Sequence, residues 1–76
     1  MLNPSIGQVF LVKFYNKVVR ALVKENQSHN FYEDHWADVH TQDVVARTEA
    51  EARTKIAKRF RPEDGFVIET VMLSAL

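Results

Sequence analysis

The chain has 76 residues, of which 46% are apolar and 26% charged, with ten basic residues, ten acidic residues and no cysteine. This length allows a single domain with one core over residues 1–76 and excludes a separate catalytic domain. The lack of cysteine excludes thiol catalysis and cysteine-based zinc sites, and the balanced charge argues against unspecific coating of nucleic acid.

Residues 8–24 fit two structures. A hairpin with Asn16 and Lys17 as its two-residue turn would place the apolar side chains on one face. A helix over the same segment would also be amphipathic, with the basic residues on its polar side. Five valines and three aromatic residues between residues 9 and 23 favour strands, whereas Lys17 stands where a hairpin turn prefers glycine. We prefer the hairpin and keep the helix as the alternative.

A third strand and a helix follow. The strand lies within residues 36–46, although the pattern does not define where it starts. Thr48, with Glu51 three residues later, matches a capping box, and apolar residues then recur every four positions. Because Pro62 ends this pattern, we predict a helix over residues 49–60.

The last predicted element is a strand over residues 66–73, which Gly65 and a short turn precede. The predicted fold is therefore α+β, in the order β-β-β-α-β. It consists of an antiparallel sheet of about four strands with one helix, over about 49–60, packed on one face.

One short helix cannot cover both faces of such a sheet. The second face would keep the apolar residues Leu11, Tyr15, Val18, Leu22, Val67, Val71 and Leu73. Apolar residues on both faces of an antiparallel sheet indicate that another surface covers the second one. We therefore expect a homodimer or a docked protein partner. If the first segment is helical instead, that helix would cover the second face and leave no need for a partner.

Histidine and acidic residues are concentrated in residues 29–43. Such side chains can hold metal ions, and His40 with Asp38 could act as a base and its orienting group. The spacing matches no metal motif, however, and neither a nucleophile elbow nor a glycine-rich phosphate loop accompanies it. We therefore predict no enzymatic activity, no catalytic residue, no metal and no cofactor.

The same stretch fits a protein-contact surface better, because aromatic anchors among charged residues are typical of interfaces. Phe31 is a third large ring in it, beside Tyr32 and Trp36. The candidate partner-binding residues are Tyr32, Glu33, Asp34, Trp36, Asp38 and Asp43. The alternative for each ring is that it fills the edge of the core.

The basic residues suggest an alternative function. Lys13 would face Arg20 across the predicted hairpin, and a patch of cations could bind phosphate groups. This basic patch consists of Lys13, Arg20, Lys55, Lys58 and Arg59. It would make the protein a small nucleic-acid-binding or regulatory dimer. No known nucleic-acid-binding signature accompanies the patch, so we expect protein binding ahead of direct nucleic-acid binding.

We expect no membrane association. The longest apolar run is Val9–Val12, which is far too short to span a bilayer. The first five residues also lack the basic and apolar regions of a signal peptide. Together with the lack of cysteine, this predicts a cytoplasmic protein.

Residues 44–71 resemble a known type of protein. An apolar strand end, Val44–Ala46, leads into a capped helix with Glu-Ala-Arg at residues 51–53, and a short turn then leads to a strand that starts after glycine. This pattern resembles small bacteriophage and mobile-element proteins, among them anti-CRISPR inhibitors of type I surveillance complexes.

The resemblance implies a non-enzymatic inhibitor in the host bacterial cytoplasm that occupies the nucleic-acid-binding surface of a defence complex. Such a surface is lined by lysine and arginine, so carboxylates can take the place of phosphates on it. The acidic residues between Glu33 and Asp43 would supply these carboxylates.

Overall fold

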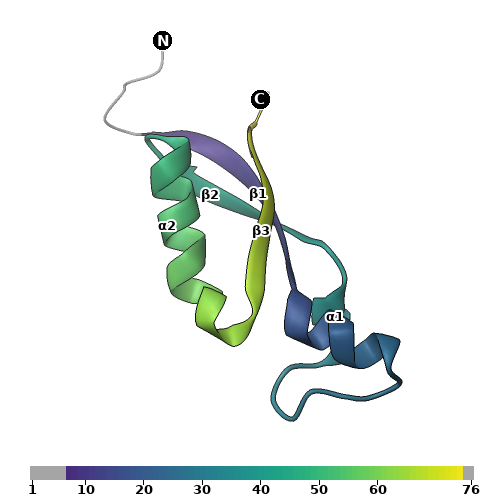
Figure 1. Cartoon of the computed structure of the whole chain (residues 1–76). Coiled ribbons are helices and arrows are strands. Elements are labelled where there is room, and N and C mark those ends of the chain that lie inside the picture. The colour runs from purple at the N-terminus through teal and green to yellow at the C-terminus, as the bar shows by residue number, and fades with distance from the viewer. Residues whose placement is uncertain (1–6, 75–76) are drawn as a thin grey trace.

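The computed structural model describes residues 7–74. Its strands are β1 (Gln8–Asn16), β2 (His40–Ala46) and β3 (Phe66–Leu73), its helices are α1 (Lys17–Lys24) and α2 (Glu49–Arg59), and η1 (Asp34–Ala37) and η2 (Pro62–Asp64) are short 3-10 helices. The strands form one antiparallel sheet in the order β2-β1-β3 (Figure 1). The α+β class is confirmed, but residues 7–74 contain three strands and two helices where we predicted about four strands and one helix.

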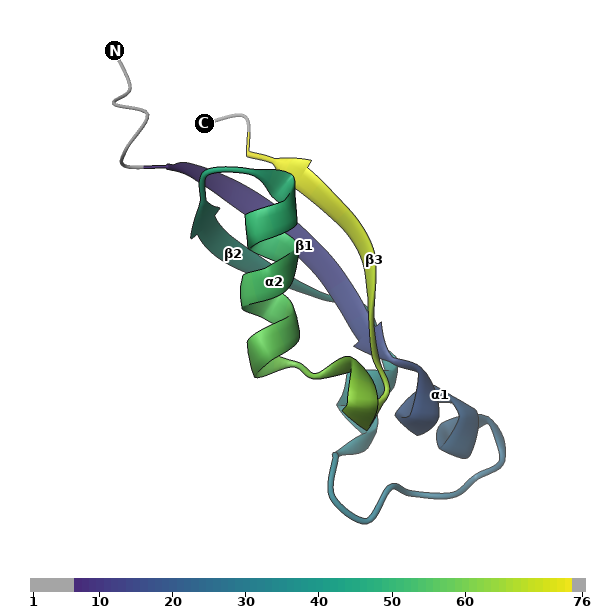
Figure 2. The ribbon, with the colours of Figure 1, turned by 60° about the vertical axis from the view of Figure 1, so that its left-hand side comes forward.

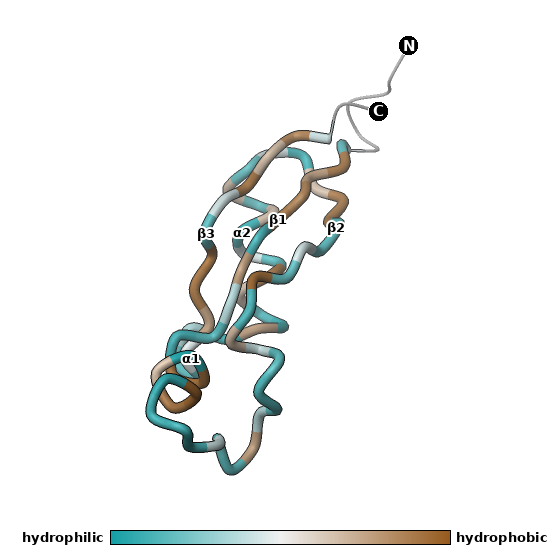
Figure 3. The backbone as a smooth tube through the Cα atoms, turned by 90° about the vertical axis from the view of Figure 1, so that its right-hand side faces the viewer, coloured by the Kyte–Doolittle hydropathy of each residue, from teal (hydrophilic) through white to brown (hydrophobic). Residues whose placement is uncertain are grey.

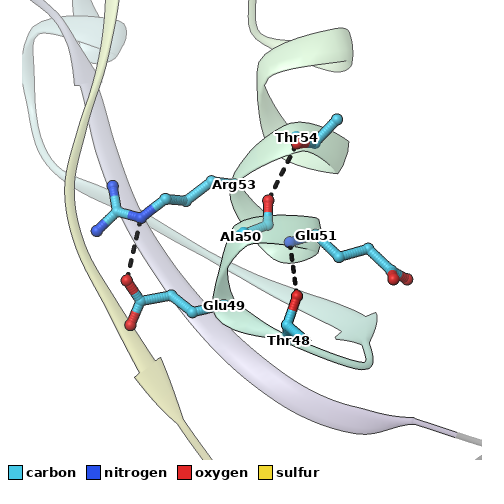
Figure 4. Close-up of polar contacts among 6 residues, drawn as sticks. All are labelled: Thr48, Glu49, Ala50, Glu51, Arg53 and Thr54. Carbon is cyan, nitrogen blue, oxygen red and sulfur yellow. Dashed lines mark hydrogen bonds and ion pairs between the residues drawn. The ribbon is translucent and has the colours of Figure 1, made fainter.

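Helix α2 lies across one face of the sheet (Figure 2). It begins at its predicted cap, where the Thr48 hydroxyl accepts the Glu51 N–H at 3.1 Å (Figure 4). Glu49 and Arg53 form an ion pair of 3.2 Å one turn apart. Such pairs, and acidic residues in the first turn, stabilise a helix. The helix predicted over residues 49–60 is confirmed and ends one residue earlier.

The core lies between α2 and the side of the sheet that faces it. Alternate residues of β1 point to this side, and Phe10, Val12 and Phe14 are buried there. Residues of the other elements complete the core: Val44, Ala46, Ala52, Ile56 and Phe66. Phe14 is central, because its ring centroid lies 4.4 Å from that of Phe60 and 6.2 Å from that of Phe66. Burial of these apolar side chains is the main stabilising contribution to the fold.

The hairpin predicted for residues 8–24 is wrong beyond Asn16. β1 is the central strand and pairs with β2 on one side and β3 on the other, so a strand over residues 17–24 would have no free edge of β1 to pair with. Asn16 instead caps α1, and its Oδ1 accepts the N–H groups of Val18 and Val19, each at 3.0 Å. Asparagine is one of the preferred N-cap residues. The alternative helix is therefore correct for residues 17–24.

Asn16 also joins α1 to the turn that precedes β3. It is fully buried, with 0% exposure, and its Nδ2 donates a hydrogen bond to the Asp64 carbonyl at 3.0 Å. Gly65 has a φ of 100°, and a Cβ there would lie 2.7 Å from both Asn16 Oδ1 and Val18 Cγ2. Only glycine fits this close approach. We call Asn16, Asp64 and Gly65 together the Asn16 junction.

The strand predicted within residues 36–46 is shorter than that range. β2 begins at His40, and the preceding η1 carries Trp36 to the edge of the core. The indole centroid lies 5.5 Å from that of Phe60, so the chain is held in a turn before the strand begins. The final strand, predicted over residues 66–73, is confirmed.

The face of the sheet opposite α2, here called the open face, is seen in Figure 3. It carries Val9, Leu11, Lys13 and Tyr15 of β1, Thr41, Asp43 and Val45 of β2, and Val67, Thr70 and Met72 of β3. Its apolar residues Val9, Leu11, Val45 and Met72 gather around the end of β1 where that strand begins. Apolar residues therefore lie on both faces of the sheet, as predicted.

A β-bulge determines which residues of β3 reach the open face. Thr70 pairs with Lys13 and Ile68 pairs with Phe14, which leaves Glu69 between them unpaired. One extra residue reverses the alternation of side chains along the strand.

Four residues predicted on the second face of the sheet lie elsewhere, two because of the bulge and two because they are helical. Val71 and Leu73 pair with Val12 and Phe10 and so lie on the α2 side, and Val18 and Leu22 belong to α1.

Helix α1 leaves most of the open face uncovered. It lies beyond the end of the sheet, packed against η1 and β3 (Figures 1 and 2), which makes the molecule 51 Å long. It reaches the open face through Arg20, whose guanidinium carbon lies 3.7 Å from the centroid of the Tyr15 ring. The expectation that a helix here would cover the second face is therefore wrong, and Met72 stays 50% exposed. Within residues 7–74, no helix is long and apolar enough to cross a membrane.

We predict that Asn16→Ala lowers the free energy of unfolding by about 2–3 kcal/mol, because it removes a helix cap and leaves buried backbone groups without partners. Asn16→Asp keeps the acceptor but loses the donor to Asp64, and should fall between Asn16→Ala and the unsubstituted protein. Urea denaturation measures both. The control is Asn30→Ala at an exposed asparagine, which should change stability by less than about 0.5 kcal/mol. Equal effects of Asn16→Ala and Asn30→Ala would contradict the role of the cap.

Candidate protein-binding surface

The Asn16 junction brings two distant segments together at one end of the molecule. Asp64 is held by Asn16 through its carbonyl, and its Oδ2 accepts the phenol hydroxyl of Tyr32 at 3.0 Å. The Tyr32 ring packs edge-on against Phe66, with centroids 5.2 Å apart. The start of β3 and the segment before η1 therefore form one surface, although they are separated by more than thirty residues in the sequence.

The loop that carries Tyr32 is held by a histidine. His29 Nδ1 accepts the backbone N–H of Phe31 at 2.9 Å and that of Tyr32 at 3.1 Å. The His29 ring also packs against that of Tyr32, with centroids 5.3 Å apart. Phe31 then stands perpendicular to Tyr32, at 4.9 Å between centroids, and 80% of it is exposed. A large apolar ring is thus presented to solvent by an ordered turn.

A shallow depression of about 490 Å³ lies between these side chains. It is lined by Val18, His29, Phe31, Tyr32, Glu63 and Asp64. Exposed Glu33 and Asp34 follow Tyr32 directly in the chain. We call these residues together the acidic aromatic surface.

Four carboxylates dominate the charge of the acidic aromatic surface: Glu33, Asp34, Glu63 and Asp64. Arg61 pairs with Glu63 at 2.7 Å, and this hydrogen bond holds the pKa of the Glu63 carboxyl below its usual range. The same pair raises the pKa of Arg61. Glu33 lies 3.4 Å from His35 Nε2. Four carboxylates against the single paired Arg61 make the surface acidic.

The phenol of Tyr32 is perturbed by its surroundings. Partial burial raises the pKa of Tyr32, and its hydrogen bond to the Asp64 carboxylate and the negative charge of that group raise it further. The protonated hydroxyl donates to Asp64 and so links the aromatic and acidic parts of the surface.

The predicted partner-binding residues separate into three groups in the structure. Tyr32, Glu33 and Asp34 belong to the acidic aromatic surface, and exposed Asp38 follows η1. Trp36 is half-buried in the edge of the core, 4.6 Å from His40 and 5.6 Å from Phe66 between centroids. Trp36 therefore fills the edge of the core, which was the alternative considered for each aromatic ring.

Asp43 lies on the open face, opposite Leu11 in the middle of β2. Asp43 lies six residues after the end of η1. Its side chain points to the side of the sheet opposite the core.

The surface includes residues that the sequence did not indicate. Glu63, Asp64, Val18 and His29 come from three separate segments. A pattern of single residues carries no information on contacts between distant segments. The only local signal is Gly65, because a glycine after a short turn marks a place where the backbone approaches other groups closely.

The five cations of the predicted basic patch lie on three different elements. Arg20 does not face Lys13 across a hairpin, because Arg20 lies in α1, where its Nε donates to the Ala37 carbonyl at 2.9 Å. Lys13 lies on the open face, whereas the other three cations, Lys55, Lys58 and Arg59, lie on α2. Lys55 is itself engaged, because its Nζ donates to the Val45 carbonyl at 2.6 Å.

Histidine and carboxylate groups do not form a metal centre within residues 7–74. His40 Nε2 lies 2.9 Å from the backbone carbonyl of His35, and Asp38 ends η1 rather than sharing a strand with His40.

No family model matches the sequence, and neither a curated protein nor a solved structure matches it.

The raised pKa of Tyr32 has a measurable consequence. Tyr15→Phe leaves Tyr32 as the only tyrosine, so ultraviolet absorbance then follows its titration alone. We expect a midpoint above the ordinary value of about 10 and a lower midpoint when Asp64→Asn is added. Because the pKa is higher in the folded state, this contribution to stability is complete below about pH 10 and is lost as the pH rises through the folded-state pKa. A midpoint that Asp64→Asn leaves unchanged would show that the hydrogen bond is not formed.

Proposed function

We propose that this protein is a non-enzymatic protein-binding module that inhibits a bacterial nucleoprotein complex. Its acidic aromatic surface would bind where the complex otherwise binds nucleic acid. The observation that carries this proposal is the exposed Phe31 beside Tyr32, with Glu63 and Asp64 lining the same depression. Exposed Glu33 and Asp34 follow Tyr32 directly in the chain.

The charge of the surface fits such a partner. Surfaces that bind nucleic acid are lined by lysine and arginine, which attract and steer a negative partner. Glu33 and Asp34 are exposed and side by side in the chain, so they can reach cations on a facing surface. Carboxylates on a fixed scaffold would thus compete with phosphates.

Phe31 supplies the apolar part of the interaction. Aromatic side chains that enter a pocket contribute much of the binding energy in protein interfaces. Because the His29 side chain holds the backbone at Phe31 and Tyr32, little conformational entropy is lost when the ring is buried. An exposed ring beside fixed carboxylates suits a specific protein site better than a phosphate chain.

The resemblance of residues 44–71 to anti-CRISPR proteins suggests the target, a type I surveillance complex of the bacterial cytoplasm. The alternative function, a nucleic-acid-binding or regulatory dimer, receives no support from the positions of the basic residues, which lie on separate elements.

Two substitutions test the proposal in a purified type I surveillance complex whose binding to target DNA is followed by fluorescence anisotropy. We expect Asp34→Lys and Phe31→Ala each to raise the concentration needed for half-inhibition by about tenfold or more, which corresponds to about 1.4 kcal/mol.

The matched controls for these variants lie on the open face. Asp43→Lys makes the same change of charge as Asp34→Lys, and Val45→Ala removes exposed apolar surface, as Phe31→Ala does. Both controls should inhibit like the unsubstituted protein. Full inhibition by Asp34→Lys and Phe31→Ala would refute the assigned surface. Salt-sensitive binding of DNA by this protein alone would favour the alternative function.

A further inference from the structure

The two outer edges of the sheet differ in how their backbone groups are used. At the edge of β2, side chains occupy two carbonyls: Lys55 Nζ donates to the Val45 carbonyl at 2.6 Å and Gln42 Nε2 donates to the Asp43 carbonyl at 3.3 Å. The positive charge of Lys55, which α2 places beside this edge, also discourages pairing with another strand. The β2 edge is therefore protected.

The pairing register shows which backbone groups of β3 point outward. The Ser74 N–H donates to the Val9 carbonyl at 2.8 Å, so these two residues form a hydrogen-bonded pair. Such pairs alternate along an antiparallel ladder. The next residues of β3, Leu73 and Val71, consequently direct their N–H and C=O groups away from β1. Within residues 7–74, no hydrogen bond reaches these outward groups.

Beyond its bulge, the β3 edge lacks protection against strand pairing. The strand has neither proline nor a basic residue, and its single charge is Glu69, in the bulge. Beyond the bulge, Leu73 is 56% exposed and Met72 is 50% exposed. An exposed, uncharged and apolar stretch of an edge strand is a site for pairing with another strand.

We propose that a second copy of this chain pairs with this edge, β3 against β3 and antiparallel, about a two-fold axis at Met72. This register places Val71 of each copy opposite Leu73 of the other, which are the residues whose backbone groups point outward. The result is a continuous sheet of six strands. The proposal goes beyond the proposed function, because it concerns assembly rather than the target.

A second copy fits this edge better than an unrelated strand because the edge is complementary to itself. In the Met72 register, the paired segment 70–74 contains no charge, so like charges do not meet across the axis. The apolar side chains of Val71 and Leu73 form cross-strand pairs on the α2 side, and Met72 meets its own copy on the open face. These are pairs that stabilise antiparallel strands.

The arrangement of the copies bears on binding. Asp64 precedes β3, so antiparallel pairing at the far end of this strand would place the two acidic aromatic surfaces at opposite ends of the dimer, up to about 50 Å apart. Such a dimer could engage two sites on one assembly and gain avidity.

Sedimentation velocity of the full chain at micromolar to millimolar concentrations tests the proposal. We expect a species of twice the 8.8 kDa chain mass and its loss in Leu73→Lys, which adds a charge to the β3 edge. Val45→Lys is the matched control, because Val45 is 55% exposed at the protected edge, and it should remain dimeric. Circular dichroism establishes that each variant is folded. Val71→Pro is the second variant, because it removes an outward N–H that β1 does not use, and it should also be monomeric.

Three results would overturn the proposal: a protein that stays monomeric at millimolar concentration, a Leu73→Lys variant that stays dimeric, or a Val45→Lys variant that dissociates as fully as Leu73→Lys. Because none of these substitutions touches the acidic aromatic surface, inhibition by monomeric Leu73→Lys would leave the proposed function intact.

Discussion

The buried Asn16 side chain joins the central strand, α1 and the turn before β3 through its hydrogen bonds. Oδ1 accepts the N–H groups of Val18 and Val19, and Nδ2 donates to the Asp64 carbonyl. An amide can satisfy both kinds of partner at once, which no apolar or purely acidic side chain can do. One residue therefore ends the central strand, begins α1 and holds the turn before β3. Gly65 completes the junction because any side chain there would collide with Asn16.

The junction links the fold to the proposed binding surface. It fixes Asp64, which accepts the hydroxyl of Tyr32, and so it orders the loop that presents Phe31 and the carboxylates. The opposite end of the sheet has a different character, because Met72 and Leu73 are exposed there at an unprotected edge. Binding to a basic partner and pairing with a second copy would thus use separate ends of one elongated molecule, and neither would obstruct the other.

Local patterns in the sequence predicted the elements whose interactions are local. The helix that begins after Thr48 and the strand over residues 66–73 follow from caps, periodicity and turn residues within a few positions. Asn16 could not be assigned in this way, because asparagine suits both a hairpin turn and a helix cap. The choice between them depends on β3 occupying the second edge of β1, which is a contact distant in the sequence. Valine content favoured a strand over residues 17–24. This prediction was wrong because strand propensity depends strongly on the surroundings of a residue.

The candidate site also depends on contacts between residues that are distant in the sequence, so only part of it could be predicted. The acidic and aromatic character of Tyr32 and Asp34 is visible in the sequence, but the contact of Tyr32 with Asp64 is tertiary. Amide hydrogen exchange at Val18 and Val19 shows whether Asn16 caps α1, because first-turn N–H groups have no partner within their own helix. We expect the Val19 amide to exchange as slowly as those of β1, and we expect Asn16→Ala to remove this protection. Fast exchange at both valines while β1 stays protected would contradict the capping role of Asn16.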